Sequence, residues 1–234
     1  MRSLYRLISK RYAVRAPFIK GSATFIALLI LSLVSIDVVS AQGTKKILVL
    51  GDSLTAGYGL PADEAFPAKL EAKLREMGYD IKVLNGGVSG DTSAGGRARL
   101  SWALSDRPDY AIIELGANDG LRGLDPNAMR DNIDDIIRRL RAAGIGVLLT
   151  GMRAPPNIGP AYEKVFNAVF PRLAKKHDVL LYPFFLEGVA AVQALNQRDG
   201  IHPNKRGVAV IVDCIMPFVV RLLGQSNKSG VPRK

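Results

Sequence analysis

The chain has 234 residues, of which 48% are hydrophobic and 23% are charged, so it can form one domain with a substantial core and is too apolar to be disordered. It contains a single cysteine, Cys214, and two histidines, His177 and His202. These counts exclude an intrachain disulfide, a cysteine-based zinc site and a histidine-rich metal centre.

The formal net charge of +11 is distributed in a way that argues against nucleic-acid binding. Residues 1–41 carry six lysines and arginines against Asp37 alone, a net charge of +5, which leaves +6 spread along the rest of the chain. No basic run interleaved with aromatic residues follows, as a nucleic-acid site would require. We expect a solvated basic surface and no nucleic-acid partner.

The first 41 residues have the order of a secretory signal peptide. A basic stretch precedes an apolar run over residues 25–36, and small residues at 39–41 predict cleavage after Ala41. The protein is therefore expected to be exported, either periplasmic or secreted. The basic stretch is long and Asp37 interrupts the end of the apolar run, so an uncleaved N-terminal membrane anchor is the alternative.

Downstream, short and almost continuously apolar runs alternate with amphipathic segments. Continuous apolar runs are typical of strands buried on both faces, and their alternation with helices predicts a parallel sheet with right-handed crossovers. The predicted strands are Lys46–Leu50, Ile81–Asn85, Tyr110–Leu115, Gly146–Thr150 and Val179–Tyr182. We expect an α/β fold in one domain over residues 42–223, followed by a flexible polar tail over 224–234.

The amphipathic segments between the strands predict helices. Pro171 should kink or shorten one of them, Pro217 should strain the end of another, and Gly95 and Gly96 weaken the prediction of a helix over residues 94–104. The apolar stripes at helical spacing are Phe66, Leu70 and Leu74; Met129, Ile133, Ile136, Ile137 and Leu140; Tyr162, Val165, Phe166, Val169 and Leu173; and Val208, Ile211, Val212, Ile215 and Val219.

Polar or glycine-rich loops follow the predicted strands. They cover residues 51–54, 86–91 and 116–120 after the first three strands, 152–160 after the fourth and 199–204 after the fifth. The carboxyl ends of parallel strands lie at one edge of a sheet, and ligands bind in the crevice outside it. The sequence therefore predicts one functional site built from these loops.

Ser53, Asp199 and His202 have the residue types and positions needed for acyl transfer. Ser53 lies on a strand-to-helix turn that exposes its hydroxyl, and Asp199 can accept a hydrogen bond from one imidazole nitrogen of His202 while the other faces Ser53. Taken singly, Ser53 could be a helix-capping serine and the other two could be ordinary loop residues. The combination predicts a nucleophile, a base and an orienting carboxylate.

Three groups are candidates for stabilising an oxyanion. The backbone N–H of Ser53 lies near a predicted helix start, Asn118 offers a neutral amide donor, and Gly90 lets the backbone approach a substrate and donate its N–H. Each of the three positions could also be an ordinary turn residue.

The segment from Met152 to Tyr162 is rich in proline and partly apolar, and it lies on the predicted active edge. Met152, Pro155, Ile158 and Tyr162 are candidates for a lid or an acyl-chain wall, with a rigid connector as the alternative.

Three other residues are expected to be structural. His177 is predicted to be a solvated surface residue at the opposite edge of the sheet. Cys214 is predicted to be a small core residue and Trp102 a packing residue.

Four ordered blocks resemble those of the GDSL, or SGNH, hydrolase family, over residues 47–220. They are Gly51-Asp52-Ser53-Leu54, Gly90 within 88–92, Gly116-Ala117-Asn118-Asp119 and the run 199–204. Residues 114–116, 118–123 and 182–185 are similar to the periplasmic multifunctional acyl-CoA thioesterase, lysophospholipase and arylesterase group. The resemblance implies a three-layer α/β/α sandwich with a central five-stranded parallel sheet, of flavodoxin-like type. It also implies the triad and oxyanion donors named above, with no metal and no cofactor.

The expected function is therefore that of a serine esterase or thioesterase that cleaves acyl esters and thioesters through an acyl-enzyme on Ser53. The expected partner is a small acyl substrate, lipids included, and the expected state is a monomer. A carbohydrate O-deacetylase of the same family is one alternative, although aromatics for stacking on sugars make up only 7% of the chain. A non-catalytic acyl- or lipid-binding protein is the other alternative.

Overall fold

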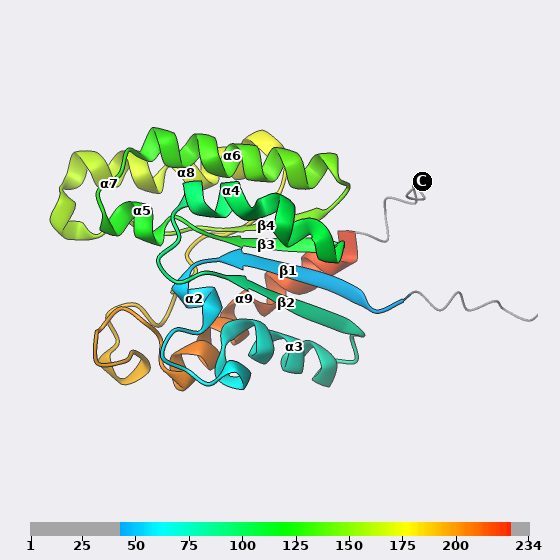
Figure 1. Ribbon diagram of the computed structural model, residues 1–234. Coiled ribbons are helices and arrows are strands. Elements are labelled where there is room, and N and C mark those ends of the chain that lie inside the picture. The colour runs from blue at the N-terminus through cyan, green and yellow to red at the C-terminus, as the bar shows by residue number, and fades with distance from the viewer. Residues whose placement is uncertain (1–42, 226–234) are drawn as a thin grey trace, which may run out of the picture. The chain divides into compact units, whose positions relative to one another are not determined.

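A five-stranded parallel sheet forms the centre of the molecule in the computed structural model, which describes residues 43–225 (Figure 1). The strand order is β2-β1-β3-β4-β5, which confirms the predicted fold class. The bounds differ from the predicted ones by two residues at most. The strands are β1 (Lys45–Gly51), β2 (Ile81–Gly87), β3 (Tyr110–Glu114), β4 (Gly146–Thr150) and β5 (Leu180–Tyr182).

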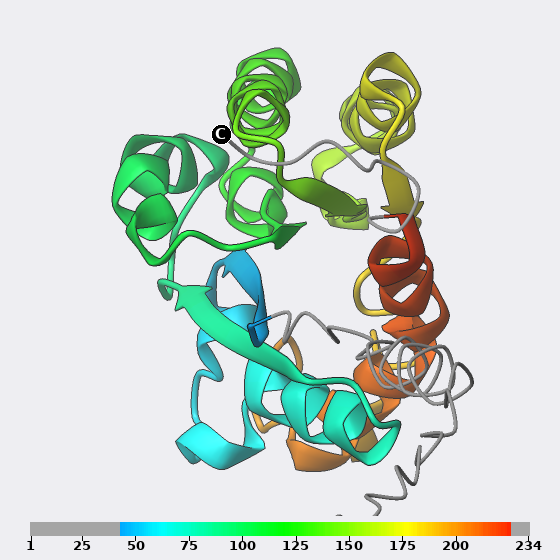
Figure 2. The same cartoon turned by 90° about the vertical axis from the view of Figure 1, so that its right-hand side faces the viewer.

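Helices cover both faces of the sheet (Figures 1 and 2). On one face, α3 packs against β2 and α9, while α9 packs against β4 and β5; on the other, α4 covers β1, and α6 and α8 cover β4. The α-helices are α2 (Ser53–Ala56), α3 (Phe66–Glu76), α4 (Ser93–Ala103), α5 (Ala117–Leu121), α6 (Pro126–Ala142), α7 (Pro160–Asn167), α8 (Val169–His177) and α9 (Lys205–Gln225), and the 3₁₀ turns are η1 (Ala62–Glu64), η2 (Leu104–Asp106), η3 (Pro156–Ile158) and η4 (Gln193–Leu195).

Three of the four apolar stripes, those of α3, α6 and α9, become the core because they face the sheet. The stripe from Tyr162 to Leu173 is wrong in part, because it spans the break between α7 and α8 and Val165 is 44% exposed. All five stripe residues of α6 are at most 1% exposed, as are Phe66, Leu70 and Leu74 of α3. The strand residues of β3 are buried on both faces, as expected of a central parallel strand. Together these residues form one continuous hydrophobic core.

The two prolines act at different places. Pro171 separates α7 from α8 as predicted, since its ring would clash with the carbonyl of Asn167, where α7 ends. The prediction for Pro217 is wrong in its position, because α9 continues beyond it to Gln225. Helix α9 is long and apolar enough to cross a membrane by length and composition, but here its apolar residues pack against α3, β4 and β5.

The three residues predicted to be structural have different surroundings. Cys214 packs against the core as predicted. Trp102 is 74% exposed, so the packing prediction is wrong: the buried face of α4 holds Leu100, and Trp102 lies on the opposite side of the helix. His177 lies at the predicted edge, but its side chain is only 13% exposed and Nε2 lies 2.7 Å from Asp134 Oδ1, so it is not a solvated residue.

Two predictions fall wholly or partly outside the described residues. The signal peptide over residues 1–41, with its cleavage after Ala41, lies outside them. Helix α9 includes the first two residues of the expected tail, and residues 226–234 lie outside the described part of the chain.

Candidate active site

Loops from distant parts of the chain meet at the carboxyl ends of the strands, at the left of Figure 1. There, Ser53 Oγ lies 2.9 Å from His202 Nε2, although the two residues are 149 positions apart. His202 Nδ1 lies 2.7 Å from Asp199 Oδ2. The structure therefore brings the three predicted triad residues into one hydrogen-bonded row.

The turn that presents Ser53 depends on its two preceding residues. Gly51 ends β1, and a Cβ there would lie 2.0 Å from Thr55 Oγ1, so no larger residue fits without displacing the turn. Asp52 caps α2, because its Oδ1 accepts the N–H of Leu54 at 3.0 Å. The chain thus passes directly from strand to helix, with Ser53 as the first helical residue.

Asp199 is tied to His202 by backbone as well as side-chain bonds. Its Oδ1 accepts the N–H groups of Ile201 and His202, each at 3.0 Å. The bond from the His202 N–H is the largest of the causes that hold the pKa of Asp199 at about 2. Asp199 is therefore ionised at neutral pH and accepts the Nδ1 proton, which leaves His202 Nε2 as the acceptor facing Ser53.

The segment that carries His202 is fixed by contacts that the sequence did not predict. The ring of Tyr58 lies 4.6 Å from the imidazole, centroid to centroid, and covers one side of it. Gln197 Nε2 donates to the carbonyl oxygens of Tyr58 and Pro203. Pro203 lies directly before Asn204, which caps α9 by accepting the N–H groups of residues 206 and 207 at its Oδ1.

Of the predicted oxyanion donors, Ser53 and Asn118 line the cavity in front of the triad. Asn118 Nδ2 donates to Asp52 Oδ2 at 3.0 Å, which uses one of its two amide hydrogens and leaves the other free. Gly90 lies in the neighbouring loop with φ of +84°, and its carbonyl accepts a bond from Arg122. It is not among the residues that line the cavity.

Glu114 is a buried carboxyl group beneath the Ser53 turn. It is fully buried at the end of β3, and its Oε2 accepts the N–H of Asp52 at 3.3 Å and the hydroxyl of Thr55 at 2.8 Å. Burial raises the pKa of Glu114 well above its usual value and that of Asp52 to about 6. The sequence signal was an acidic residue at the end of an apolar strand, between Ile113 and Leu115.

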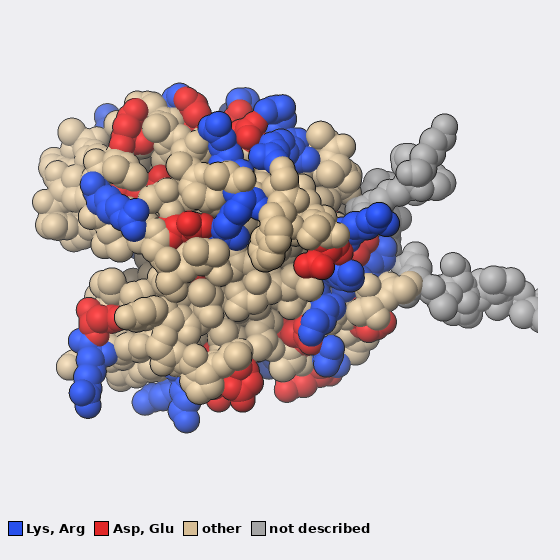
Figure 3. Space-filling view, viewed as in Figure 1, with Lys and Arg blue, Asp and Glu red and all other residues tan. Residues whose placement is uncertain are grey.

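A cavity of about 480 Å³ opens beside Ser53 and His202, and Figure 3 shows the surface hollowed at the left-hand end of the molecule. Its wall is mainly apolar. It includes Met152 and Pro155, as predicted, but not Ile158 or Tyr162. Other apolar wall residues, which the sequence did not predict, are Leu54, Leu121, Ala154, Phe184, Leu186 and Ile201.

Tyr162 has a different role from the predicted one. It lies in the first turn of α7, where its hydroxyl donates to the carbonyl of Leu124 at 2.8 Å and its ring stacks on Phe166. Ile158 lies half-buried in η3. Neither residue lines the cavity, and in the same segment the Ala154 N–H donates to Asn167 Oδ1 at 2.9 Å. Of this segment, residues 152–156 line the cavity.

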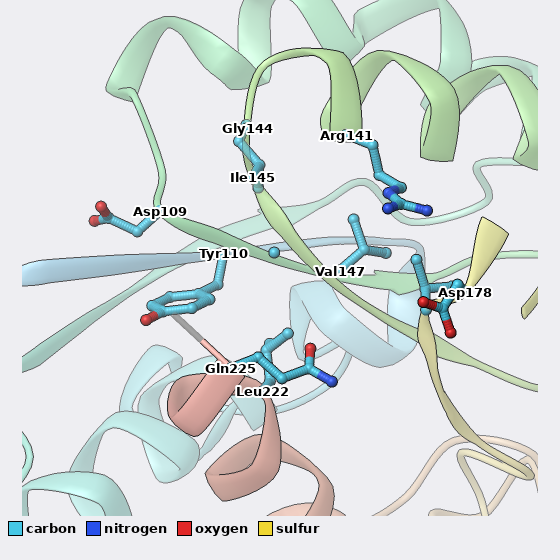
Figure 4. A pocket seen from close by; sticks show the side chains of 11 residues that line it. Asp109, Tyr110, Arg141, Gly144, Ile145, Val147, Asp178, Leu222 and Gln225 are labelled. Carbon is cyan, nitrogen blue, oxygen red and sulfur yellow. The ribbon is translucent and has the colours of Figure 1, made fainter. Parts of the chain in front are cut away.

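A second hollow, of about 270 Å³, lies at the opposite edge of the sheet (Figure 4). Its lining includes Asp109, Arg141 and Asp178, but no serine, cysteine or histidine. Across residues 43–225 no group of three or more His, Cys, Asp or Glu side chains is placed to hold a metal ion. The candidate active site is therefore the cavity in front of Ser53.

We expect Glu114→Gln to stabilise the protein increasingly as pH rises. The raised pKa means that the folded carboxyl keeps a proton which the unfolded chain releases, so the wild-type protein loses stability between the two pKa values as pH increases. The amide does not titrate. The variant's melting temperature relative to wild type should therefore be higher at pH 8 than at pH 5, measured by scanning calorimetry.

The exposed Glu76→Gln is the matched control, because its side chain stays in water on folding. A Glu114→Gln difference that stays constant or shrinks from pH 5 to pH 8 would contradict the protonated state of Glu114.

Comparison with known proteins agrees with this geometry. The chain matches the GDSL-like Lipase/Acylhydrolase family over residues 49–210. It is 40% identical over 199 residues to Esterase TesA of Pseudomonas aeruginosa, covering 84% of this chain and 99% of that protein. It is 41% identical to Thioesterase 1/protease 1/lysophospholipase L1 of Escherichia coli strain K12, covering 74% of this chain and 82% of that protein.

A similar solved structure is that of the psychrotrophic esterase EstA from a Pseudoalteromonas species, inhibited by monoethylphosphonate. It has a TM-score of 0.73 and 35% identity, and it covers 77% of this chain and 99% of that one. The matched span of the family contains Ser53, Asn118 and His202. The resemblance drawn from the sequence is confirmed, and the chain belongs to the GDSL-like lipase/acylhydrolase family.

Proposed function

We propose that the protein is a serine hydrolase that cleaves carboxylic esters and thioesters of acyl chains through an acyl-enzyme on Ser53. The observation that carries this proposal is the hydrogen-bonded row of Asp199, His202 and Ser53 at the mouth of an apolar cavity. Relatives named as an esterase and as a thioesterase and lysophospholipase support it.

The first half of the reaction forms the acyl-enzyme. Ser53 Oγ attacks the carbonyl carbon of the substrate as its proton passes to His202 Nε2, and Asp199 stabilises the resulting imidazolium. The tetrahedral intermediate then collapses. Its carbon–oxygen or carbon–sulfur bond breaks, and His202 returns the proton to the departing alcohol or thiol.

The second half reverses these steps with water. His202 Nε2 removes a proton from a water molecule, whose oxygen attacks the acyl carbon, and the ester bond to Ser53 breaks. His202 then protonates Ser53 Oγ and the carboxylic acid leaves. Besides the substrate, only water and these side chains exchange atoms or protons in the two half-reactions.

The negative charge on the tetrahedral intermediate requires hydrogen-bond donors. We assign this role to the free amide hydrogen of Asn118 and the N–H of Ser53, which line the cavity, and, by the family resemblance, to the N–H of Gly90 in the neighbouring loop. Asp52 holds the other Asn118 hydrogen at 3.0 Å, which fixes the orientation of the amide before the substrate arrives. Because the donor is already aligned, little reorganisation is needed as charge develops.

The apolar wall favours acyl chains over acetyl groups or sugars. Phe184 is at most 9% exposed, and Leu186 and Met152 add further apolar surface beside Ser53. An acyl chain in the cavity gains about 0.8 kcal/mol for each methylene removed from water. This observation favours acyl esters and thioesters over the carbohydrate O-deacetylase alternative.

Covalent labelling distinguishes an enzyme from a non-catalytic binder. We expect a fluorophosphonate probe to label the wild-type protein on Ser53 and Ser53→Ala to abolish both labelling and ester hydrolysis, measured by intact-protein mass spectrometry and p-nitrophenyl ester assays. The exposed Ser105→Ala should be labelled like wild type. An unlabelled wild-type protein, or labelling that survives Ser53→Ala, would refute the proposal.

Asn118→Ala should lower kcat by about 10²–10³-fold, because it removes one oxyanion donor that acts mainly in the transition state. The Michaelis constant should change little. Steady-state kinetics on one ester with the exposed Asn157→Ala as control would test this, and an unchanged kcat would remove Asn118 from the oxyanion site.

The cavity wall should set the preference for chain length. We expect kcat/KM to be higher for p-nitrophenyl octanoate than for the acetate, and Leu121→Ser to lower the octanoate value about threefold or more while sparing the acetate. Leu121 lines the cavity, whereas Leu124 is similarly exposed and does not, so Leu124→Ser is the control. A wild-type preference for acetate would exclude the acyl-chain pocket.

A further inference from the structure

Arg99 connects two of the loops that carry the proposed oxyanion donors. Its Nε lies 2.6 Å from Asp91 Oδ2 and its Nη2 donates to the carbonyl of Gly51 at 2.8 Å. Asp91 follows Gly90 directly, and Gly51 lies two residues before Ser53. One guanidinium on α4 therefore joins the end of β1 to the loop after β2.

The loop held by Arg99 is a tight turn. The N–H of Asp91 donates to the carbonyl of Val88 at 3.0 Å, with Ser89 and Gly90 between them, and Gly90 has φ of +84°. The N–H of Val88 donates in turn to the carbonyl of Gly51 at 3.1 Å. The position of Asp91 therefore sets the direction of the Gly90 backbone relative to the Ser53 turn.

Both partners of the ion pair are largely buried, with side chains 17% and 18% exposed. Arginine suits this position because its planar group presents several donors in a fixed geometry, so one side chain can hold a carboxylate and a carbonyl at a set separation. A lysine could reach one of the two acceptors but lacks the second, rigidly placed donor.

The glycine pair that weakened the helix prediction is explained by this arrangement. A Cβ at Gly95 would lie 2.4 Å from Asp91 Oδ1, and a Cβ at Gly96 would lie 2.4 Å from Leu115 Cδ1. Gly95 therefore leaves room for the Asp91 carboxylate against α4, and Gly96 lets the helix pack onto the end of β3. Thr92 Oγ1 caps the helix at 3.4 Å from the Gly95 nitrogen.

We propose that Arg99 is a positioning residue for the hydrolytic reaction, which holds the loop carrying Gly90 against the Ser53 turn by clamping Asp91 to the carbonyl of Gly51. This inference rests on the proposed function. It assigns Arg99, Asp91 and Gly95 a role in aligning the oxyanion donors, although none of them lines the cavity. The alignment of the oxyanion donors matters mainly in the transition state. Loss of the clamp should therefore change kcat and not substrate binding.

Arg99→Met and Arg99→Lys test the clamp directly. We expect Arg99→Met to lower kcat by about 10- to 100-fold with KM within about twofold of wild type, and Arg99→Lys to recover little of that loss. The rate of inactivation by a fluorophosphonate should fall in parallel with kcat, because that reaction also develops negative charge on an oxygen facing the same donors.

Arg139→Met is the matched control. Arg139 also joins two segments with one guanidinium, since it donates to the carbonyl of Arg97 and to Ser101 Oγ, but it does so between α6 and α4, away from the cavity. Like Arg99→Met, this substitution removes one guanidinium that holds α4, but kcat should stay near the wild-type value.

Gly95→Ala tests the same clamp without removing a charge. Alanine favours a helix by about 1 kcal/mol over glycine, so thermal stability should hold, while the displaced Asp91 carboxylate lowers kcat in the same direction as Arg99→Met. The open Gly224→Ala in α9 is its control. If Arg99→Met fails to fold, the kcat of Gly95→Ala still tests the proposed clamp.

Asp91→Ala combined with Arg99→Met completes the test. The two substitutions remove one clamp, so their effects on kcat should be far from additive. A kcat for Arg99→Met or Gly95→Ala within twofold of wild type would overturn the inference, as would additive effects in the double variant. If instead the wild-type protein is not labelled on Ser53, the proposed function fails and the inference fails with it.

Discussion

All parallel strands of one sheet end at the same edge, and the rest of this structure depends on that constraint. β1 lies between β2 and β3, so the loops after these three strands must be neighbours at the point where the chain reverses its order across the sheet. Ser53 and His202 are 149 residues apart in sequence, and the 2.9 Å hydrogen bond between them is a consequence of this topology. Without the shared edge, no local motif could bring these groups together.

Topology places the loops near one another, and side-chain hydrogen bonds fix their distances. Asn118 joins the loop after β3 to the loop after β1 through Asp52, and Arg99 joins the loop after β1 to the loop after β2. Ser93 closes the ring, since its N–H and hydroxyl donate to Asp119 at 2.8 and 2.6 Å. Each loop that carries a proposed oxyanion donor is therefore held by two others, and this redundancy keeps the donors aligned while water or substrate fills the cavity.

The sequence predicted the five strands because continuous apolar runs are a strong local signal, and it predicted the triad because the residue types combine at one edge of the sheet. A run such as Ile47–Leu50 is typical of a central strand, and Asp199 and His202 are close enough in sequence to pair directly. Residues whose role depends on distant neighbours escaped prediction. Trp102 looked like a core residue by type alone, Tyr162 was assigned by its segment, and Tyr58 contacts the imidazole only because residues 58 and 197 meet in the folded chain.

The buried carboxyl of Glu114 shows how acidic side chains can lie beneath the Ser53 turn and remain compatible with catalysis. Asp52 must be ionised to orient Asn118 most strongly, yet its negative charge lies on the same loop as the oxyanion that develops at Ser53. A second ionised carboxylate beneath the turn would oppose that oxyanion further. Burial raises the pKa of Glu114 well above its usual value and so favours its neutral form, while its Oε2 accepts hydrogen bonds from Asp52 N–H and Thr55. The protein thus obtains an acceptor that fixes the nucleophile turn without adding charge to the site.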